Sequence, residues 1–389
     1  TGSASWVTTV KTSTFTAVAG EGYFVNTTAG AISVNLPAGT AGDVVAIKDY
    51  ANTFDSNAVT LVQNGSDKIG GSAVNAVLST EGLAVTLVFV DSTQGWLVTD
   101  NGTQDTAPTT RFITATGGTI TCSGNFRIHT FTGPGALCVS CAGNPSGSTT
   151  VDYLVVASGG GGGSGLGGGG GAGGFRTNFP SSCSGIPVSV QPYPIAVGSG
   201  GAAGIPDGGS GTPGNNSTFS SITSTAGGGA VARSSPTPVG PGGSGGGGSG
   251  LAAYPGGTGN TPPTSPPQGN DGGDGSSGTK RSGGGGGGAA GDGGDALSAT
   301  YAVGGVGSSN SITGSAIFYA GGGGGNGDPG GPAPSGLGGN GGGGNGGPST
   351  NGTAGAANTG GGGGGGAGSC SNGAAGGSGI VIIRYKFQN

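Results

Sequence analysis

The run Gly360-Gly-Gly-Gly-Gly-Gly-Gly366 is followed closely by the apolar segment Ile380-Val-Ile-Ile383, and this pair sets the main constraint on the fold. A glycine run has no side chain to bury, and fixing each of its residues costs roughly 1–2 kcal/mol of conformational free energy. Backbone hydrogen bonds and close van der Waals contact are the only compensation. We therefore expect an isolated run to be unstable and many runs packed side by side to be stable.

Similar runs recur upstream and lack the Gly-X-Y period of collagen; they occupy 159–163, 167–171, 245–248, 283–288, 321–325 and 341–344. An extended threefold helix of the polyproline II type points its N–H and C=O groups sideways, where neighbouring helices can bond them. The pattern predicts a polyglycine II helical bundle with variable loops over 158–379. Interior positions of such a bundle tolerate no Cβ atom, and the structural positions singled out are Gly245, Gly285, Gly323 and Gly363.

The first part of the chain, residues 1–104, has a different pattern. Short apolar and β-branched segments, such as Ile32-Ser-Val-Asn-Leu36 and Val59-Thr-Leu-Val62, alternate with turn residues at a spacing near ten residues. This spacing predicts an all-β, sandwich-like module with essentially no α-helix. Residues 105–157 are predicted to form a linker and β entry strands, and residues 380–389 a closing β-strand.

Composition excludes several classes of protein. The chain has 389 residues with 104 Gly, 22 Pro, 7% charged residues and a net charge of −5. It has no basic cluster for nucleic acid and no apolar run of about 18 residues for membrane insertion. Low complexity usually indicates disorder, but β-patterned segments on both sides of the glycine region predict order. Because the chain lacks Met, we expect a processed product or a fragment.

Residues suited to catalysis or metal binding are scarce. Glu occurs only at Glu21 and Glu81, and the single His is His129, so we expect no catalytic residue, no enzyme activity and no cofactor. Cys138 and Cys141 form a CxxC motif without a second pair, whereas zinc needs four ligands. The five cysteines leave disulfides and free thiols open. Asp271, Asp274, Asp292 and Asp295 follow glycines without the nine-residue period of calcium repeats, which favours turns. No metal site is predicted.

Aromatic side chains in the glycine-rich part concentrate in the connections between runs. Parallel rods place their turns at two ends, so aromatic residues there are candidate receptor-binding groups. Burial of the same residues along the flanks is the alternative. The candidates are Tyr193, Tyr254, Tyr301, Phe318 and Tyr319.

Two sets of phrases resemble known phage modules. Glu21-Gly-Tyr-Phe-Val-Asn-Thr-Thr28 and Gly95-Trp-Leu97 resemble a module of tail-fibre and virion proteins of aquatic phages. Arg127-Ile-His-Thr-Phe131, Tyr153-Leu-Val-Val-Ala157 and Gly377-Ser-Gly-Ile-Val-Ile-Ile-Arg-Tyr385 resemble the glycine-rich domain of phage tail proteins. Some members present variable loops to host receptors from a polyglycine sandwich. The resemblance implies a virion or extracellular protein that binds a bacterial surface protein or glycan and assembles as a homotrimer.

Two other functions stay open. Exposed β edges and packed glycine segments can propagate head to tail, so the chain could be the subunit of an extracellular bacterial fibril. The absence of Met suits such an exported product. A polysaccharide-degrading tail-spike enzyme is the third reading, which the scarcity of Glu and His disfavours.

Overall fold

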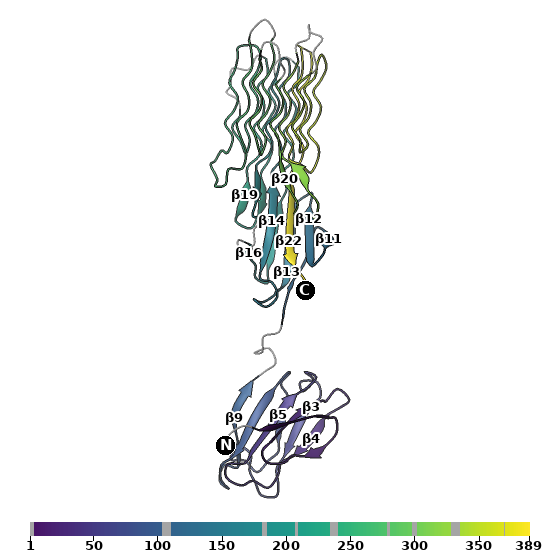
Figure 1. Ribbon diagram of the computed structural model, residues 1–389, viewed down its shortest axis with the longest axis vertical. Coiled ribbons are helices and arrows are strands. Elements are labelled where there is room, and N and C mark those ends of the chain that lie inside the picture. The colour runs from purple at the N-terminus through teal and green to yellow at the C-terminus, as the bar shows by residue number, and fades with distance from the viewer. Residues whose placement is uncertain are drawn as a thin grey trace. The chain divides into compact units, whose positions relative to one another are not determined.

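The protein is described by a computed structural model that covers residues 4–102, 110–180, 185–206, 209–233, 240–277, 281–297, 302–327, 335–368 and 370–389. The chain divides into two compact units, Thr1–Thr109 and Thr110–Asn389. Every regular element of the described residues is a β-strand (Figure 1). The prediction of an all-β protein with essentially no α-helix is therefore confirmed for this part of the chain.

The first unit contains two sheets. Sheet A has five strands in the order β1-β3-β5-β8-β9, and sheet B has four in the order β2-β4-β6-β7. The strands are β1 (Ser5–Lys11), β2 (Phe15–Thr16), β3 (Glu21–Val25), β4 (Ile32–Asn35), β5 (Val44–Asp49), β6 (Val59–Val62), β7 (Ala76–Leu78), β8 (Ala84–Phe89) and β9 (Trp96–Gly102).

The chain alternates between these sheets. Odd strands β1, β3 and β5 pair in parallel in sheet A, and even strands β2, β4 and β6 pair in parallel in sheet B. The chain thus winds through both sheets in successive coils until β7, β8 and β9 close them with antiparallel pairs. Alternating apolar residues on β6 and β8 point inward because successive side chains of a strand face opposite sides.

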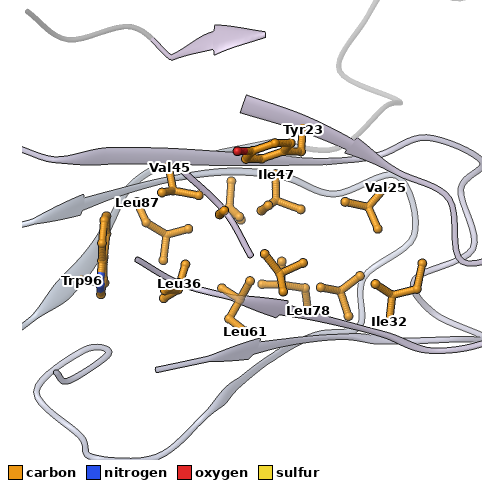
Figure 2. Close-up of a cluster of buried hydrophobic side chains, with 14 of the residues drawn as sticks. Tyr23, Val25, Ile32, Leu36, Val45, Ile47, Leu61, Leu78, Leu87 and Trp96 are labelled. Atoms are coloured by element: carbon orange, nitrogen blue, oxygen red, sulfur yellow. The ribbon is translucent and has the colours of Figure 1, made fainter. Parts of the chain in front are cut away.

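The core of the first unit lies between sheets A and B. Figure 2 shows side chains from the two layers pointing toward one another, with Trp96 at one end and Ile32 at the other. Leu87 and Trp96 are fully buried. Burial of apolar side chains is thus the main stabilising contribution in this unit.

The second unit begins with two further sheets. Sheet C has the order β10-β13-β17-β18-β19, and sheet D the order β11-β12-β22-β14-β15, with β16 also paired to β14. The strands are β10 (Ile113–Thr116), β11 (Thr119–Ser123), β12 (Phe126–Phe131), β13 (Gly135–Ala142), β14 (Thr150–Val156), β15 (Phe175–Thr177), β16 (Ile186–Pro187), β17 (Pro192–Ala196), β18 (Ser217–Phe219), β19 (Ile222–Ser224) and β22 (Ile380–Lys386). A hairpin of β20 (Ser308–Asn310) and β21 (Ile317–Tyr319) forms a separate two-stranded sheet.

Sheets C and D enclose an apolar core that includes Val155, Phe219 and Ile383. The other face of sheet D carries Ile128, Leu154 and Ile382 and is partly covered by residues of the β20–β21 hairpin. Strand β22 lies between β12 and β14, so residues on both sides of the glycine region meet in one sheet. This sheet anchors the glycine-rich segments at one end.

The prediction of a polyglycine II helical bundle is wrong. The described residues contain no helix of any kind, and hence no helix that is long and apolar enough to cross a bilayer. The glycine runs are instead extended segments that pass back and forth between two ends (Figure 1). Their recorded backbone hydrogen bonds join segments that are distant in sequence, so the region is a laterally bonded stack. We call the segments between 157 and 379 the glycine lattice.

Candidate functional site

The centre of the glycine lattice is the segment 167–171. Its glycines are all buried. Gly170 donates its backbone N–H to the Gly363 carbonyl at 2.7 Å and accepts from the Gly323 N–H at 2.9 Å. A β-strand bonds only two neighbours, whereas this segment exchanges backbone bonds with segments 159–163, 227–231, 245–248, 283–288, 321–325 and 360–366. Lateral bonding in several directions makes the lattice a rigid scaffold.

The structural glycines predicted from the sequence lie inside this scaffold. A Cβ atom at Gly363 would come within 3.0 Å of the Ala374 carbonyl oxygen, and one at Gly323 would meet the Gly363 carbonyl oxygen. At Gly245 and Gly285 the obstacles are the carbonyl oxygens of Gly257 and Val303. Because these obstacles are backbone atoms, they cannot move aside as a flexible side chain would.

Aspartates complete the hydrogen bonding along one edge of the lattice. The Asp295 carboxylate accepts from the Asp274 N–H at 2.8 Å, and the Asp274 carboxylate accepts from the Gly256 N–H at 2.8 Å. The arrangement recurs at the aspartates three residues earlier in the sequence: the Asp292 carboxylate accepts from the Asp271 N–H at 3.2 Å, and the Asp271 carboxylate accepts from the Gly259 N–H at 2.7 Å. These carboxylates replace missing carbonyl partners. Within the described residues, no group of three or more His, Cys, Asp or Glu side chains could hold a metal ion.

The lattice has two ends, of which one adjoins sheets C and D. The segment that leaves β14 and the segment that enters β15 run antiparallel, because Ala157 bonds Gly174 and Gly163 bonds Gly168. The turn at 164–166 therefore lies at the end away from the sheets, which we call the distal end (Figure 1). Backbone hydrogen bonds place further turns of the chain beside the turn at 164–166. The described residues of these turns include 205–206, 249–254, 276–277, 281–282 and 370–372.

Exposed apolar side chains are found in these distal turns. Ile205 is 67% exposed and Leu297 is 61% exposed. Tyr254 is half-buried in the turn after Ser249, next to exposed Ala252 and Ala253. Arg281 is exposed in the turn that follows Ser276. Ile205 and Leu297 were not among the predicted candidates, which were all aromatic. The feature that could have indicated them is an apolar residue in a short connection between two glycine-rich segments.

The five aromatic candidates are not brought together. Of these, Tyr254 lies at the distal end, whereas Tyr193 is buried on β17 in the core between sheets C and D. Tyr319 is buried on β21 against sheet D, and its neighbour Phe318 is 48% exposed on the same hairpin. Tyr301 lies outside the described residues.

The single histidine is a buried structural residue. His129 Nδ1 lies 2.7 Å from the Gly117 carbonyl oxygen, which can only accept, so this nitrogen carries the proton. Nε2 then accepts from the Tyr385 hydroxyl at 3.0 Å, and that hydroxyl accepts from the Ala115 N–H at 3.1 Å. Burial lowers the pKa of His129 below 6.5, against the opposing effect of the Gly117 carbonyl. The network ties β10, β12 and β22 together.

The cysteines do not form a site among the described residues. Cys122, Cys138, Cys141 and Cys370 are free thiols. Cys138 and Cys141 lie on β13, where they face Thr116 and Thr114 of β10 in the sheet register. Cys183 lies outside the described residues.

The pattern of the glycine-rich domain matches residues 139–386, most of the second unit. The chain belongs to the glycine-rich domain family. In this glycine-rich domain protein, the matched segment begins on β13 and ends on β22, so it contains the lattice and strands β14, β15 and β22 of sheet D, whereas β11 and β12 precede it.

One relative is a phage protein. The chain is 38% identical over 79 residues to the baseplate wedge protein gp10 of Enterobacteria phage T4. The similarity covers 20% of this chain, and the chain spans only 13% of that protein. The glycine-rich domain and this partial similarity are consistent with a phage structural protein.

Proposed function

We propose that this protein is a non-enzymatic tail-fibre protein that recognises the host surface through the turns at the distal end of its glycine lattice. The observation that carries the proposal is the contrast within the lattice between its buried backbone and its exposed distal side chains. Segment 167–171 is closely packed, whereas Ile205 and Leu297 are exposed. A rigid scaffold that presents apolar groups at one end loses little conformational entropy on binding.

The non-catalytic role is part of the same proposal. The sole histidine is fully buried, and its two ring nitrogens are hydrogen-bonded to the Gly117 carbonyl and the Tyr385 hydroxyl. General acid–base catalysis requires a group within hydrogen-bond reach of a substrate, and His129 cannot meet this condition without unfolding of sheet D.

Cell binding by purified protein tests the recognition role. The double variant Ile205→Ser/Leu297→Ser removes the exposed apolar groups at the distal end. We expect at least about tenfold weaker binding to host cells with an unchanged melting temperature, since each buried apolar side chain contributes roughly 1.5–3 kcal/mol. The matched control is Val74→Ser/Val77→Ser, which alters exposed valines of the first unit. Equal binding by both double variants would contradict a distal recognition surface.

Assembly as a homotrimer and location on the virion complete the proposal. They are supported by the resemblance of the first unit to virion modules and by the phage relative. Solution mass and electron microscopy test them: discrete three-chain particles are expected, whereas long filaments of this chain alone would support an extracellular fibril instead.

A further inference from the structure

An open groove of about 800 Å³ lies on the outer face of sheet D. It is lined by Phe126 from β12, Asp152 from β14, Arg384 and Lys386 from β22, and by Phe179 and residues between 145 and 150. The volume is within the range of roughly 300–1,000 Å³ that small-molecule sites occupy. The groove is a feature of the sheets and includes none of the distal turns.

Arg384 is fixed in this groove by aromatic rings. Its guanidinium carbon lies 3.9 Å from the centroid of the Phe126 ring and 4.7 Å from that of Phe179. Its buried Nε has no hydrogen-bond partner, and no ion pair or hydrogen bond from this guanidinium to a described residue is recorded. An arginine remains charged under all ordinary conditions. The groove therefore contains an oriented cation whose planar set of donors is not used by any residue that the structure describes.

Asp152 lies directly across from Arg384 in the register of β14 and β22. Burial raises the pKa of Asp152, and the positive charge of Arg384 opposes the rise. Asn178 Nδ2 lies 3.4 Å from one carboxylate oxygen, which leaves the other free to accept. Lys386 adds a second cation, bonded through Nζ to the neutral Asn389 side chain at 2.8 Å.

The lining thus combines a net positive charge, a carboxylate acceptor, apolar ring edges and hydroxyl groups. The chain as a whole has a net charge of −5, so two cations beside one carboxylate form a local exception. A saccharide can donate its hydroxyls to a carboxylate and pack its C–H groups against aromatic rings. A carboxylate or phosphate on the saccharide can accept hydrogen bonds from the paired N–H groups of a guanidinium. We propose that this groove binds an anionic saccharide, with its carboxylate or phosphate on Arg384 and its hydroxyls on Asp152.

This site goes beyond the proposed recognition by the distal turns, and either can fail without the other. The test is calorimetric titration of the full chain with an oligouronide of four sugars and with the neutral oligosaccharide of the same length. We expect binding of the oligouronide that weakens with added salt, and much weaker binding of the neutral form. Competition with inorganic phosphate shows which anionic group of the saccharide the site accepts. Displacement of the oligouronide by phosphate indicates that the site also accepts a phosphate, and no displacement indicates that it is selective for a carboxylate.

Arg384→Gln should weaken oligouronide binding at least about tenfold, because a hydrogen bond to a charged group contributes roughly 1.5–3 kcal/mol. Since Arg384 packs between two rings, Lys386→Gln gives a second variant at the exposed margin, with an expected loss of roughly threefold. Arg281→Gln is the matched control, because it removes the same charge at the distal end. Melting temperatures show that each variant folds.

The outcomes are distinct. Weaker binding by both groove variants and unchanged binding by Arg281→Gln support the site. If only Arg281→Gln weakens oligouronide binding, the saccharide binds at the distal turns, and the proposal is overturned. Absence of oligouronide binding by the unaltered chain, or equal affinity for the neutral oligosaccharide, also overturns it.

Discussion

The two units of this protein solve the problem of stability in opposite ways. In the first unit, side chains such as Leu87 and Trp96 fill the space between two sheets, and the backbone lies around them. In the glycine lattice, the backbone itself fills the interior, as the bonds of Gly170 to Gly363 and Gly323 show. A protein core can thus be built from side chains or from backbone, but the two kinds of core permit different substitutions. A side-chain core accepts a smaller residue at a cost, whereas a backbone core has no smaller residue to accept.

The largest effect is expected from Gly363→Leu. The new side chain would meet the Ala374 carbonyl oxygen, so we expect the second unit to lose more than about 3 kcal/mol or to fail to fold. The first unit should keep its own thermal transition in differential scanning calorimetry. Gly133→Ala is the control, because a Cβ there has open space. An unchanged transition of the second unit in Gly363→Leu would show that the lattice is not closely packed.

Leu87→Ala tests the side-chain core. Leu87 is fully buried, and its truncation should cost about 3 kcal/mol through lost burial and a cavity. The loss should appear in the transition of the first unit only, as measured by chemical denaturation. Val98→Ala is the control, since Val98 is exposed on β9. A matching loss in the second unit would mean that the two units unfold together.

A smaller effect is expected at the edge of the lattice. Asp274→Ala removes the acceptor of the Gly256 N–H and should cost about 1 kcal/mol of the second unit's stability. Asp274→Asn keeps a side-chain oxygen at the same place and should restore most of it. If both variants unfold at the same denaturant concentration, the carboxylate does not complete the backbone bonding.

The smallest effect at neutral pH belongs to His129. Its pKa is lowered by burial, so its contribution is present above pH 6.5 and is lost as the pH falls from there through the folded-state value. Protonation of Nε2 would turn an acceptor of the Tyr385 hydroxyl into a second donor. The unfolding midpoint of the second unit should fall between about pH 7.5 and about pH 5 more steeply than in His129→Gln. Parallel slopes would exclude this residue as the source.

Much of the strand content could be predicted from the sequence. Segments Val59–Val62 and Ala84–Phe89 are short runs of apolar and β-branched residues between turn residues, and both are strands, as predicted. The parallel pairing of β1, β3 and β5 could not be predicted. The sequence of a strand indicates which of its side chains share a face of the sheet, but not which other strand it pairs with. Spacing near ten residues is compatible with hairpins and with coils that alternate between sheets.

The glycine region was predictable in one respect and not in another. Glycine runs without side chains require lateral backbone bonds, but the sequence does not say which runs adjoin, and the helical form assigned to them is wrong. The position of the connections was also hidden. Tyr254 and Gln268 lie in one long connection, yet Tyr254 is distal while Gln268 is buried against Thr225 beside sheet D. Polar loop sequences look alike at either end.

The place of β22 in the middle of sheet D has a consequence for biosynthesis. Its partners β12 and β14 precede the lattice in the sequence, whereas β22 follows it. The sheet that anchors the lattice therefore cannot close while the chain is still being translated through residue 379, and contacts of such long sequence separation form slowly. The whole glycine-rich segment between β14 and β22 is therefore synthesised before this sheet can be completed, so the second unit is open to misfolding until its last strand arrives.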